Sequence, residues 1–329
     1  MRRAPASPAH TTRHTAAPSP AGAIRPRPVP RGTPMRLLRA LTLLIPAAVL
    51  AAGCAAPGES GSGAGDGEDR TVRIGVSDGA EPYWNVFTEK AAAEGITVEL
   101  VNFTDYNQPN PALSQGQLDL NQFQHLQYLA NYNVQNDEDL VPVGATAVYP
   151  LPLYSAKHTD LAQIPQGGQI VIPNDAVNQA RALNVLQSAG LLRLTDGGTT
   201  TSTPADIDRA ASTVTVTPVD AAQTAANLPS ADGAVVNNNY ATSANLTADQ
   251  VLYGEDPDSD AAKPYINLFV ARADQAQDPD FATLVRIYHD QQVLDAARKD
   301  LGEDGVFRDN TPEDLQQTLS GIEQQLRAG

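Results

Sequence analysis

The residues best suited to binding chemistry lie in one stretch, residues 102–129. This stretch holds the rings of Tyr106, Phe123, His125 and Tyr128 and many side-chain amides, but few charged residues. A solvated linker would contain few aromatic residues, and a core segment would contain fewer amides. Aromatic walls with a few uncharged polar anchors are typical of small-molecule pockets. We therefore predict that this stretch lines a ligand pocket.

A second polar group begins a predicted helix after residue 173. Asn174 or Asp175 can cap the helix, and Asn178 and Arg181 lie three residues apart on one face. A helix N-terminus offers free N–H groups, and a guanidinium adds two parallel donors, so together they suit a carboxylate. The alternative is a solvated Arg181 on an ordinary helix, and the spacing alone does not decide between them.

Three consecutive amides, Asn237 to Asn239, directly follow an apolar segment that predicts a strand. Ligands in α/β proteins are held at the carboxyl ends of strands. We therefore include Asn237 among the candidate binding residues. The alternative is simple helix capping, which one asparagine would satisfy.

His125 is interpreted either as a neutral hydrogen-bonding ring in a pocket wall or as a satisfied structural histidine. A metal site is disfavoured because His125, His158 and His289 are far apart in the sequence. The sequence has no Gly-x-Ser-x-Gly and no His-Glu-x-x-His motif, so a binding protein without a cofactor is favoured over an enzyme. A hydrolase with paired carboxylates and a surface adhesin remain alternatives.

The N-terminal residues predict export and lipid attachment. Residues 1–53 contain eight arginines and no acid, whereas the remaining residues carry 14 basic and 38 acidic side chains. Such an acidic body repels nucleic acid and anionic lipid. Residues 35–53 combine a basic start with an apolar segment too short to span a bilayer, and small residues precede Cys54, the only cysteine. We predict lipidation of Cys54; the alternative is a plain secretory signal.

The chain therefore divides into a leader and a folded body. Residues 1–34 are predicted to be disordered, or to precede a true start at Met35. Residues 35–53 are the predicted lipoprotein signal peptide, and residues 54–69 are a flexible Gly/Ser/Ala-rich tether.

Strand and helix patterns alternate from residue 70 onward and predict an α/β fold with largely parallel sheets. Two long apolar runs are interpreted as crossover strands between two lobes, with a ligand cleft between them. Lobe 1 is expected to span 70–148 plus 264–329, and lobe 2 to span 149–263. The predicted strands are 71–76, 96–103, 118–120, 140–155, 168–172, 213–219, 233–236 and 264–271. The predicted helices are 82–94, 111–115, 128–134, 177–189, 280–298 and 312–327.

Several blocks in this order resemble the NlpA family of methionine-binding lipoproteins, the receptors of methionine ABC importers. The most specific are Phe123-Gln-His-x-x-Tyr128 and Pro173-Asn-Asp-x-x-Asn-x-x-Arg181. The resemblance covers about residues 70–300 and implies a two-lobed periplasmic-binding-protein fold of type II, with an amino acid bound in the cleft.

The resemblance also implies roles for individual residues. Arg181 would bind the ligand carboxylate, and Asn178 and Asn237 would hydrogen-bond its polar end. The thioether chain would be walled by Tyr106, Phe123, His125 and Tyr128. The implied partners are L-methionine or a related amino acid, an ABC permease with its ATPase, and a lipid anchor on the extracytoplasmic face of the cell membrane. The protein is expected to be monomeric, and D-methionine, a methionine dipeptide or another apolar amino acid is an alternative ligand.

Three segments depart from the family pattern. Many relatives have Thr-Pro-Gly-Pro-His near residues 77–81, where this chain reads Ser77-Asp-Gly-Ala-Glu-Pro-Tyr-Trp84. Tyr83 or Trp84 is placed either to alter selectivity or to pack on the surface. Residues 194–211 are loose and rich in Thr and Gly, and residues 302–329 run past the usual end of the family.

Overall fold

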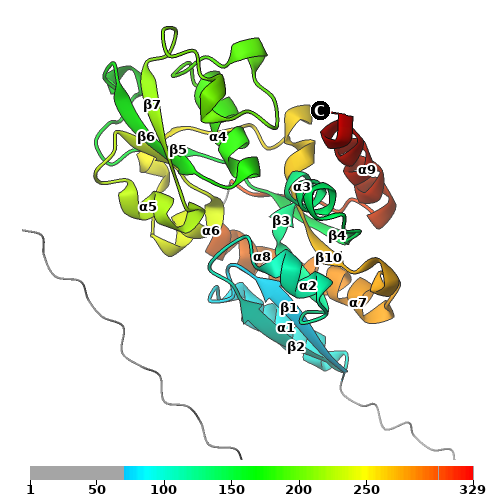
Figure 1. Cartoon of the computed structure of the whole chain (residues 1–329). Coiled ribbons are helices and arrows are strands. Elements are labelled where there is room, and N and C mark those ends of the chain that lie inside the picture. The colour runs from blue at the N-terminus through cyan, green and yellow to red at the C-terminus, as the bar shows by residue number, and fades with distance from the viewer. Residues whose placement is uncertain (1–69, 303, 329) are drawn as a thin grey trace, which may run out of the picture. The chain divides into compact units, whose positions relative to one another are not determined.

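The computed structural model describes residues 70–302 and 304–328, which form a two-lobed α/β fold with one sheet in each lobe (Figure 1). The predicted fold class is confirmed. The predicted leader, signal peptide, tether and lipidated Cys54 lie outside the described residues. Within the described ranges, no helix combines the length and apolarity needed to cross a bilayer.

The first lobe is built on a six-stranded sheet. Its strands, in sheet order, are β11 (Val306–Phe307), β4 (Val141–Val148), β10 (Ile266–Ala271), β3 (Leu120–His125), β1 (Arg70–Val76) and β2 (Ile96–Asn102). Successive side chains of a strand point to opposite faces. Accordingly, Phe269 packs in the core on one face, and Leu268 and Val270 pack in the core on the other.

Helices cover both faces of this sheet. One core contains side chains of α1 (Tyr83–Ala93), α7 (Pro279–Tyr288) and α8 (Gln291–Leu301). The opposite core contains side chains of α2 (Pro109–Ser114), α3 (Leu126–Asn136) and α9 (Pro312–Ala328). The two cores hold the ends of β1 and β3 in place. Several residues that line the pocket lie at those ends or directly after them.

The second lobe is built on a five-stranded sheet. Its strands, in sheet order, are β7 (Val214–Val219), β6 (Gly168–Pro173), β8 (Gly233–Val235), β5 (Leu153–Tyr154) and β9 (Val251–Tyr253). Helix α4 (Ala176–Ser188) packs on the face that buries Ile170 and Ile172. Helices α5 (Thr224–Asn227) and α6 (Asn238–Ser243) lie on the face that buries Val171. The 3₁₀ turns of both lobes are η1 (Leu161–Gln163), η2 (Thr195–Gly197), η3 (Pro204–Asp206), η4 (Ala221–Gln223), η5 (Ala248–Gln250), η6 (Asp260–Tyr265) and η7 (Ala273–Gln275).

The chain crosses from the first sheet to the second between β4 and β5, and returns between β9 and β10. Strand β5 pairs antiparallel with β8, and β10 pairs antiparallel with both β3 and β4. The expectation of largely parallel sheets is therefore wrong at these strands. Strands β5 and β10 are each the first strand after a crossing, so no helix within their own sheet constrains them to the parallel direction. Strands β9 and β11 also pair antiparallel, with β5 and β4.

Two predicted elements have different bounds. The strand predicted at residues 118–120 instead begins at Leu120 and continues through three amides and Phe123 to His125. The helical stretch predicted at 280–298 is divided between α7 and α8, because Asp290 caps the second helix by accepting a hydrogen bond from the Gln292 N–H. Residues 194–211 contain only η2 and η3, in agreement with their loose sequence.

Candidate ligand-binding site

Both lobes contribute walls to a cavity near the ends of β1, β3 and β8. Its volume, including the part that opens to solvent, is about 690 Å³. All seven residues predicted to bind a ligand line it: Tyr106, Phe123, His125, Tyr128, Asn178, Arg181 and Asn237. The fold therefore brings together side chains that the sequence separates by more than 100 residues.

Aromatic rings from the first lobe form one wall. Phe123 and His125 alternate on β3, Tyr128 lies in the first turn of α3, and Tyr106 precedes α2. The ring centroid of Phe123 is 6.0 Å from that of Tyr106 and 5.8 Å from that of Tyr128. Tyr240 of the second lobe does not line the cavity, but its ring centroid lies 5.1 Å from that of Tyr106 and supports that ring. Together these rings make a surface suited to an apolar ligand tail.

His125 presents a hydrogen-bond donor at the cavity. The Tyr128 N–H donates to His125 Nδ1 at 3.2 Å, so the side chain also caps α3. Because Nδ1 is an acceptor, this hydrogen bonding assigns the proton of the neutral ring to Nε2. Burial, together with the charge of Arg181, lowers the pKa of His125 to about 3. Nε2 is buried and has no partner among the described residues, so a neutral donor is left for a ligand.

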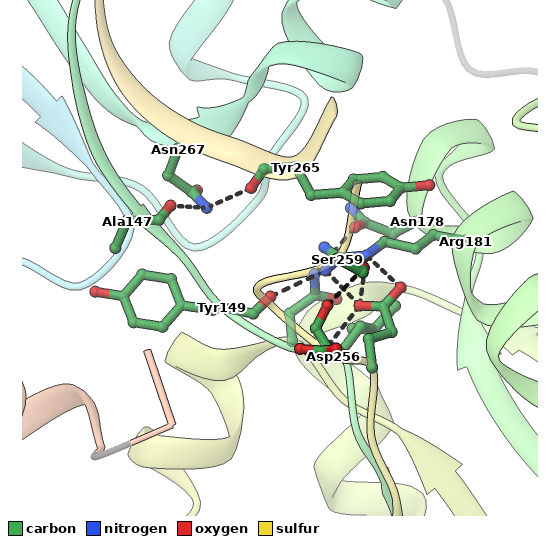
Figure 2. Close-up of polar contacts among 11 residues, drawn as sticks. Ala147, Tyr149, Asn178, Arg181, Asp256, Ser259, Tyr265 and Asn267 are labelled. Carbon is green, nitrogen blue, oxygen red and sulfur yellow. Dashed lines mark hydrogen bonds and ion pairs between the residues drawn. The ribbon is translucent and has the colours of Figure 1, made fainter. Parts of the chain in front are cut away.

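Arg181 is held on three sides, and its side chain is only 5% exposed (Figure 2). Its Nε donates to both carboxylate oxygens of Glu255 at 3.1 Å, and its Nη2 donates to the Tyr149 carbonyl at 2.9 Å. Its Cζ lies 3.9 Å from the centroid of the Tyr265 ring. Nη1 makes no hydrogen bond to any residue in the described ranges. The alternative of a solvated Arg181 is therefore wrong.

A chain of amides fixes an acceptor at the same cavity. Asp175 caps α4 by accepting from the Asn178 N–H at 2.9 Å, and it also accepts from Asn178 Nδ2 at 3.1 Å. This leaves Asn178 Oδ1 to accept from Asn237 Nδ2 at 3.1 Å. Asn237 Oδ1 is then the free end of the chain, buried and without a partner among the described residues.

The two roles weighed for Asn237 are distinguished by the same geometry. Asn237 occupies the N-cap position of α6, but its side chain makes no capping hydrogen bond. The capping interpretation is therefore wrong, and the side chain serves the amide chain and the cavity instead.

The segment after β1 contains two buried aromatic residues. Tyr83 and Trp84 are 0% and 1% exposed and pack in the core of the first lobe, so the interpretation as surface packing is wrong. Both donate hydrogen bonds to Asp78, which lines the cavity.

Several residues around the cavity were not predicted from the sequence. Glu255 and Tyr265 hold Arg181, and Asn239 accepts a hydrogen bond from the Tyr106 hydroxyl across the two lobes. Glu255 lies 74 residues from Arg181 in a segment without a periodic pattern, so no local signal connected them. Among the described residues, no three His, Cys, Asp or Glu side chains gather where they could hold a metal.

The cavity thus offers hydrogen-bond donors at Arg181 and His125, an acceptor at Asn237, and an aromatic wall. Donors suit a carboxylate, and an amide oxygen suits an ammonium group. The arrangement is suited to binding a small zwitterion with an apolar tail.

Comparison with known proteins agrees with a protein that binds a small ligand. The family model described as NlpA lipoprotein matches residues 72–308. The chain is 37% identical over 241 residues to a probable D-methionine-binding lipoprotein MetQ of Haemophilus influenzae, covering 72% of this chain and 86% of that protein.

Solved structures agree. The substrate-binding protein of a methionine transporter from Streptococcus pneumoniae is similar with a TM-score of 0.66 and 36% identity, covering 72% of this chain and 95% of that one. A nutrient-binding protein from Burkholderia cenocepacia bound to methionine is similar with a TM-score of 0.66 and 34% identity, covering 72% and 99%. The similarity covers the described body, and helix α9 lies beyond the end of the matched family region.

Proposed function

Because this chain belongs to the NlpA lipoprotein family, a family of substrate-binding transport proteins rather than enzymes, we propose that it captures methionine in the cavity between its lobes. It then delivers the amino acid to the permease of an ABC importer, which is driven by its ATPase. The relatives named as methionine-binding proteins support the ligand class.

The observation that supports this proposal most strongly is the pair of buried, unpartnered atoms at one cavity, His125 Nε2 and Asn237 Oδ1. An unpartnered buried polar group costs about 1–3 kcal/mol, so a ligand that pairs with both atoms removes that cost when it binds. One atom is a donor and the other an acceptor, as the two ends of a zwitterion require. In our proposal, Arg181 and His125 bind the carboxylate, and Asn178 and Asn237 complete the polar end.

The thioether then lies against Tyr106, Phe123 and Tyr128. Contacts between sulfur and aromatic rings are favourable by about 0.3–1.5 kcal/mol, which ranks methionine above an isosteric hydrocarbon by a modest factor. D-methionine is the second candidate, because the Haemophilus influenzae relative carries that ligand in its name. A methionine dipeptide or another apolar amino acid is a third.

We further propose that Cys54 is lipidated and that the body functions at the extracytoplasmic face of the cell membrane. The family description as a lipoprotein supports this, and so does the apolar segment that precedes the cysteine. A monomer suffices for this role.

Calorimetric titration of the body lacking residues 1–54 tests the proposal. The cores that hold the sheets lie within residues 72–322, so this body keeps all of them. The protein is first unfolded and refolded to remove any co-purified ligand, then titrated with L-methionine, D-methionine and L-leucine. We expect the strongest binding for L-methionine, with a change in the fluorescence of Trp84, the only tryptophan. Absence of heat and of a fluorescence change at millimolar methionine would refute the proposal.

A further inference from the structure

Asp78 follows β1 and is the only acidic residue among the side chains that line the cavity. Arg181 is the only lysine or arginine among them. Only one of these two charges has a counter-charge among the described residues. Glu255 neutralises Arg181, whereas no lysine, arginine or histidine of the described residues forms an ion pair with Asp78. The cavity therefore contains one acid without a counter-charge.

Two buried rings hold the Asp78 carboxylate in place. The Tyr83 hydroxyl donates to Oδ2 at 2.8 Å, and Trp84 Nε1 donates to Oδ1 at 3.0 Å. Both rings belong to α1 and are packed in the core of the first lobe. A carboxylate accepts about four hydrogen bonds, and Tyr83, Trp84 and the backbone provide three, so one acceptor position stays open. The carboxylate is therefore held in one position, but its hydrogen-bonding capacity is not filled.

Burial raises the pKa of Asp78, and only the hydrogen bonds from Trp84, Tyr83 and the backbone oppose this. A nearby cation would lower it much more strongly. The protein itself provides no such cation here.

Other acceptors at the cavity also lack a donor. Gln122 Oε1 and Asn237 Oδ1 both line it, and both are buried without a partner among the described residues. An ammonium group has three N–H donors and one positive charge. The unpaired acceptors of the cavity suit the N–H donors, and the acid without a counter-charge suits the positive charge.

We propose that Asp78 is a specificity-determining residue, whose carboxylate provides the counter-charge for the ammonium group of an amino-acid ligand. This inference depends on the proposed function and adds the group that the pocket requires on its ligand. Tyr83 and Trp84 are positioning residues that act through Asp78. The pocket accordingly binds ligands that keep the carboxylate and the thioether but lack the amine more weakly than it binds the amino acid.

The test is calorimetric titration of the full chain in detergent with two ligands. One is L-methionine, and the other is 4-(methylthio)butanoate, which lacks only the ammonium group. Asp78→Asn keeps the shape and the acceptor oxygen but removes the charge. We expect it to weaken L-methionine binding by about 10- to 100-fold and to leave binding of 4-(methylthio)butanoate nearly unchanged.

Control variants separate the charge from the fold. Asp139→Asn removes an exposed carboxylate that does not line the cavity, and it should change neither affinity. Tyr83→Phe removes one of the two donors to Asp78, and it should shift the ratio of the two affinities by a smaller factor. That ratio depends on the ammonium contact, so a general loss of stability would not move it.

The outcomes are distinct. If wild type does not bind L-methionine, the proposed function fails and this inference fails with it. If wild type binds L-methionine but Asp78→Asn weakens both ligands equally, or neither, the proposed function stands and the role of Asp78 is overturned.

Discussion

The two lobes contribute different chemistry to the same cavity. The first lobe provides most of the rings, and Tyr106, Phe123 and Tyr128 touch one another there. The second lobe provides a guanidinium and a chain of amides, of which Arg181 and Asn178 are among the most buried polar residues of the chain. The wall from the first lobe is mainly aromatic, with polar members such as Asp78, Gln122 and His125, and the wall from the second lobe is polar and directional.

The difference lies in how each wall is held. Two polar groups that face the cavity from the second lobe are oriented by acids of the same lobe: Glu255 orients Arg181, and Asp175 orients Asn178. Groups held in this way lose little freedom on binding, so more of their interaction energy remains as affinity. The rings are positioned mainly by packing, with hydrogen bonds at Tyr106 and His125. We conclude that the polar wall selects functional groups and the aromatic wall selects the tail.

The largest effect is expected from removing the polar wall's charge. Arg181→Ala should weaken binding of every carboxylate ligand by about 2–5 kcal/mol, because the ligand loses its cation and meets the unpaired Glu255 carboxylate. L-methionine and L-norleucine, which has a methylene in place of sulfur, should be affected equally in calorimetric titrations. Arg327→Ala, at an exposed arginine of α9, is the control and should leave affinity unchanged. An unaltered affinity in Arg181→Ala would disprove the division between the walls.

His125 lies among the rings of the first lobe, but it offers a hydrogen-bond donor, as the polar groups of the second lobe do. Its pKa of about 3 in the folded protein lies below its ordinary value of 6.5, so the unfolded chain binds more protons between those two pH values. The free energy of unfolding therefore contains a His125 contribution that is complete above pH 6.5. This contribution falls by at most about 1.4 kcal/mol for each pH unit as the pH drops toward 3.

Urea unfolding at several pH values between 4 and 7 measures this contribution. His125→Gln should show a shallower pH dependence than wild type over that range. Asp78 and Asp175 have raised pKa values with the opposite effect on stability, but they are present in both proteins and cancel in the difference. Parallel curves for the two proteins would show that His125 is not held neutral.

Residue types and the family resemblance predicted the members of the cavity, and short-range geometry in the structure explains why many of them meet. Alternation on a strand puts Phe123 and His125 on one face, and the helix that follows brings Tyr128 back beside them. The spacing from Asp175 to Arg181 similarly puts a cap, an amide and a guanidinium on one helix face. These are local rules, and they hold wherever the elements themselves form.

Long-range partners were not predictable in this way. Strand β3 was predicted to end at Leu120, whereas in the structure it begins there and contains three amides. In the structure, Asn121 and Gln124 are buried and satisfy each other and Asn110, with hydrogen bonds of 2.5–3.0 Å between the three side chains. Burial of amides is acceptable only when they are paired in this way, and the pairing depends on tertiary contacts. The same holds for Glu255, which reaches Arg181 across 74 residues.

Contacts between the lobes should affect both walls together. The Tyr240 hydroxyl of α6 donates to the Thr104 carbonyl of the first lobe at 3.0 Å. Tyr240→Phe removes this hydrogen bond and keeps the ring, so it should weaken binding by about 0.5–1.5 kcal/mol for all ligands alike. Tyr253→Phe, at a partly exposed tyrosine of β9, provides the control in the same titrations. A change that depends on the ligand tail would place Tyr240 in the aromatic wall instead.

The smallest effect is expected from the aromatic wall, and it is the one that depends on the tail. Phe123→Leu keeps an apolar side chain between Tyr106 and Tyr128 but removes the ring face. L-methionine should lose about 0.3–1.5 kcal/mol of binding free energy and L-norleucine less, because only sulfur gains from a ring. Calorimetric titrations of both ligands measure the ratio, which should fall roughly two- to tenfold. Equal weakening of both ligands would mean that the ring contributes only apolar area, and the tail would then be selected by shape rather than by sulfur.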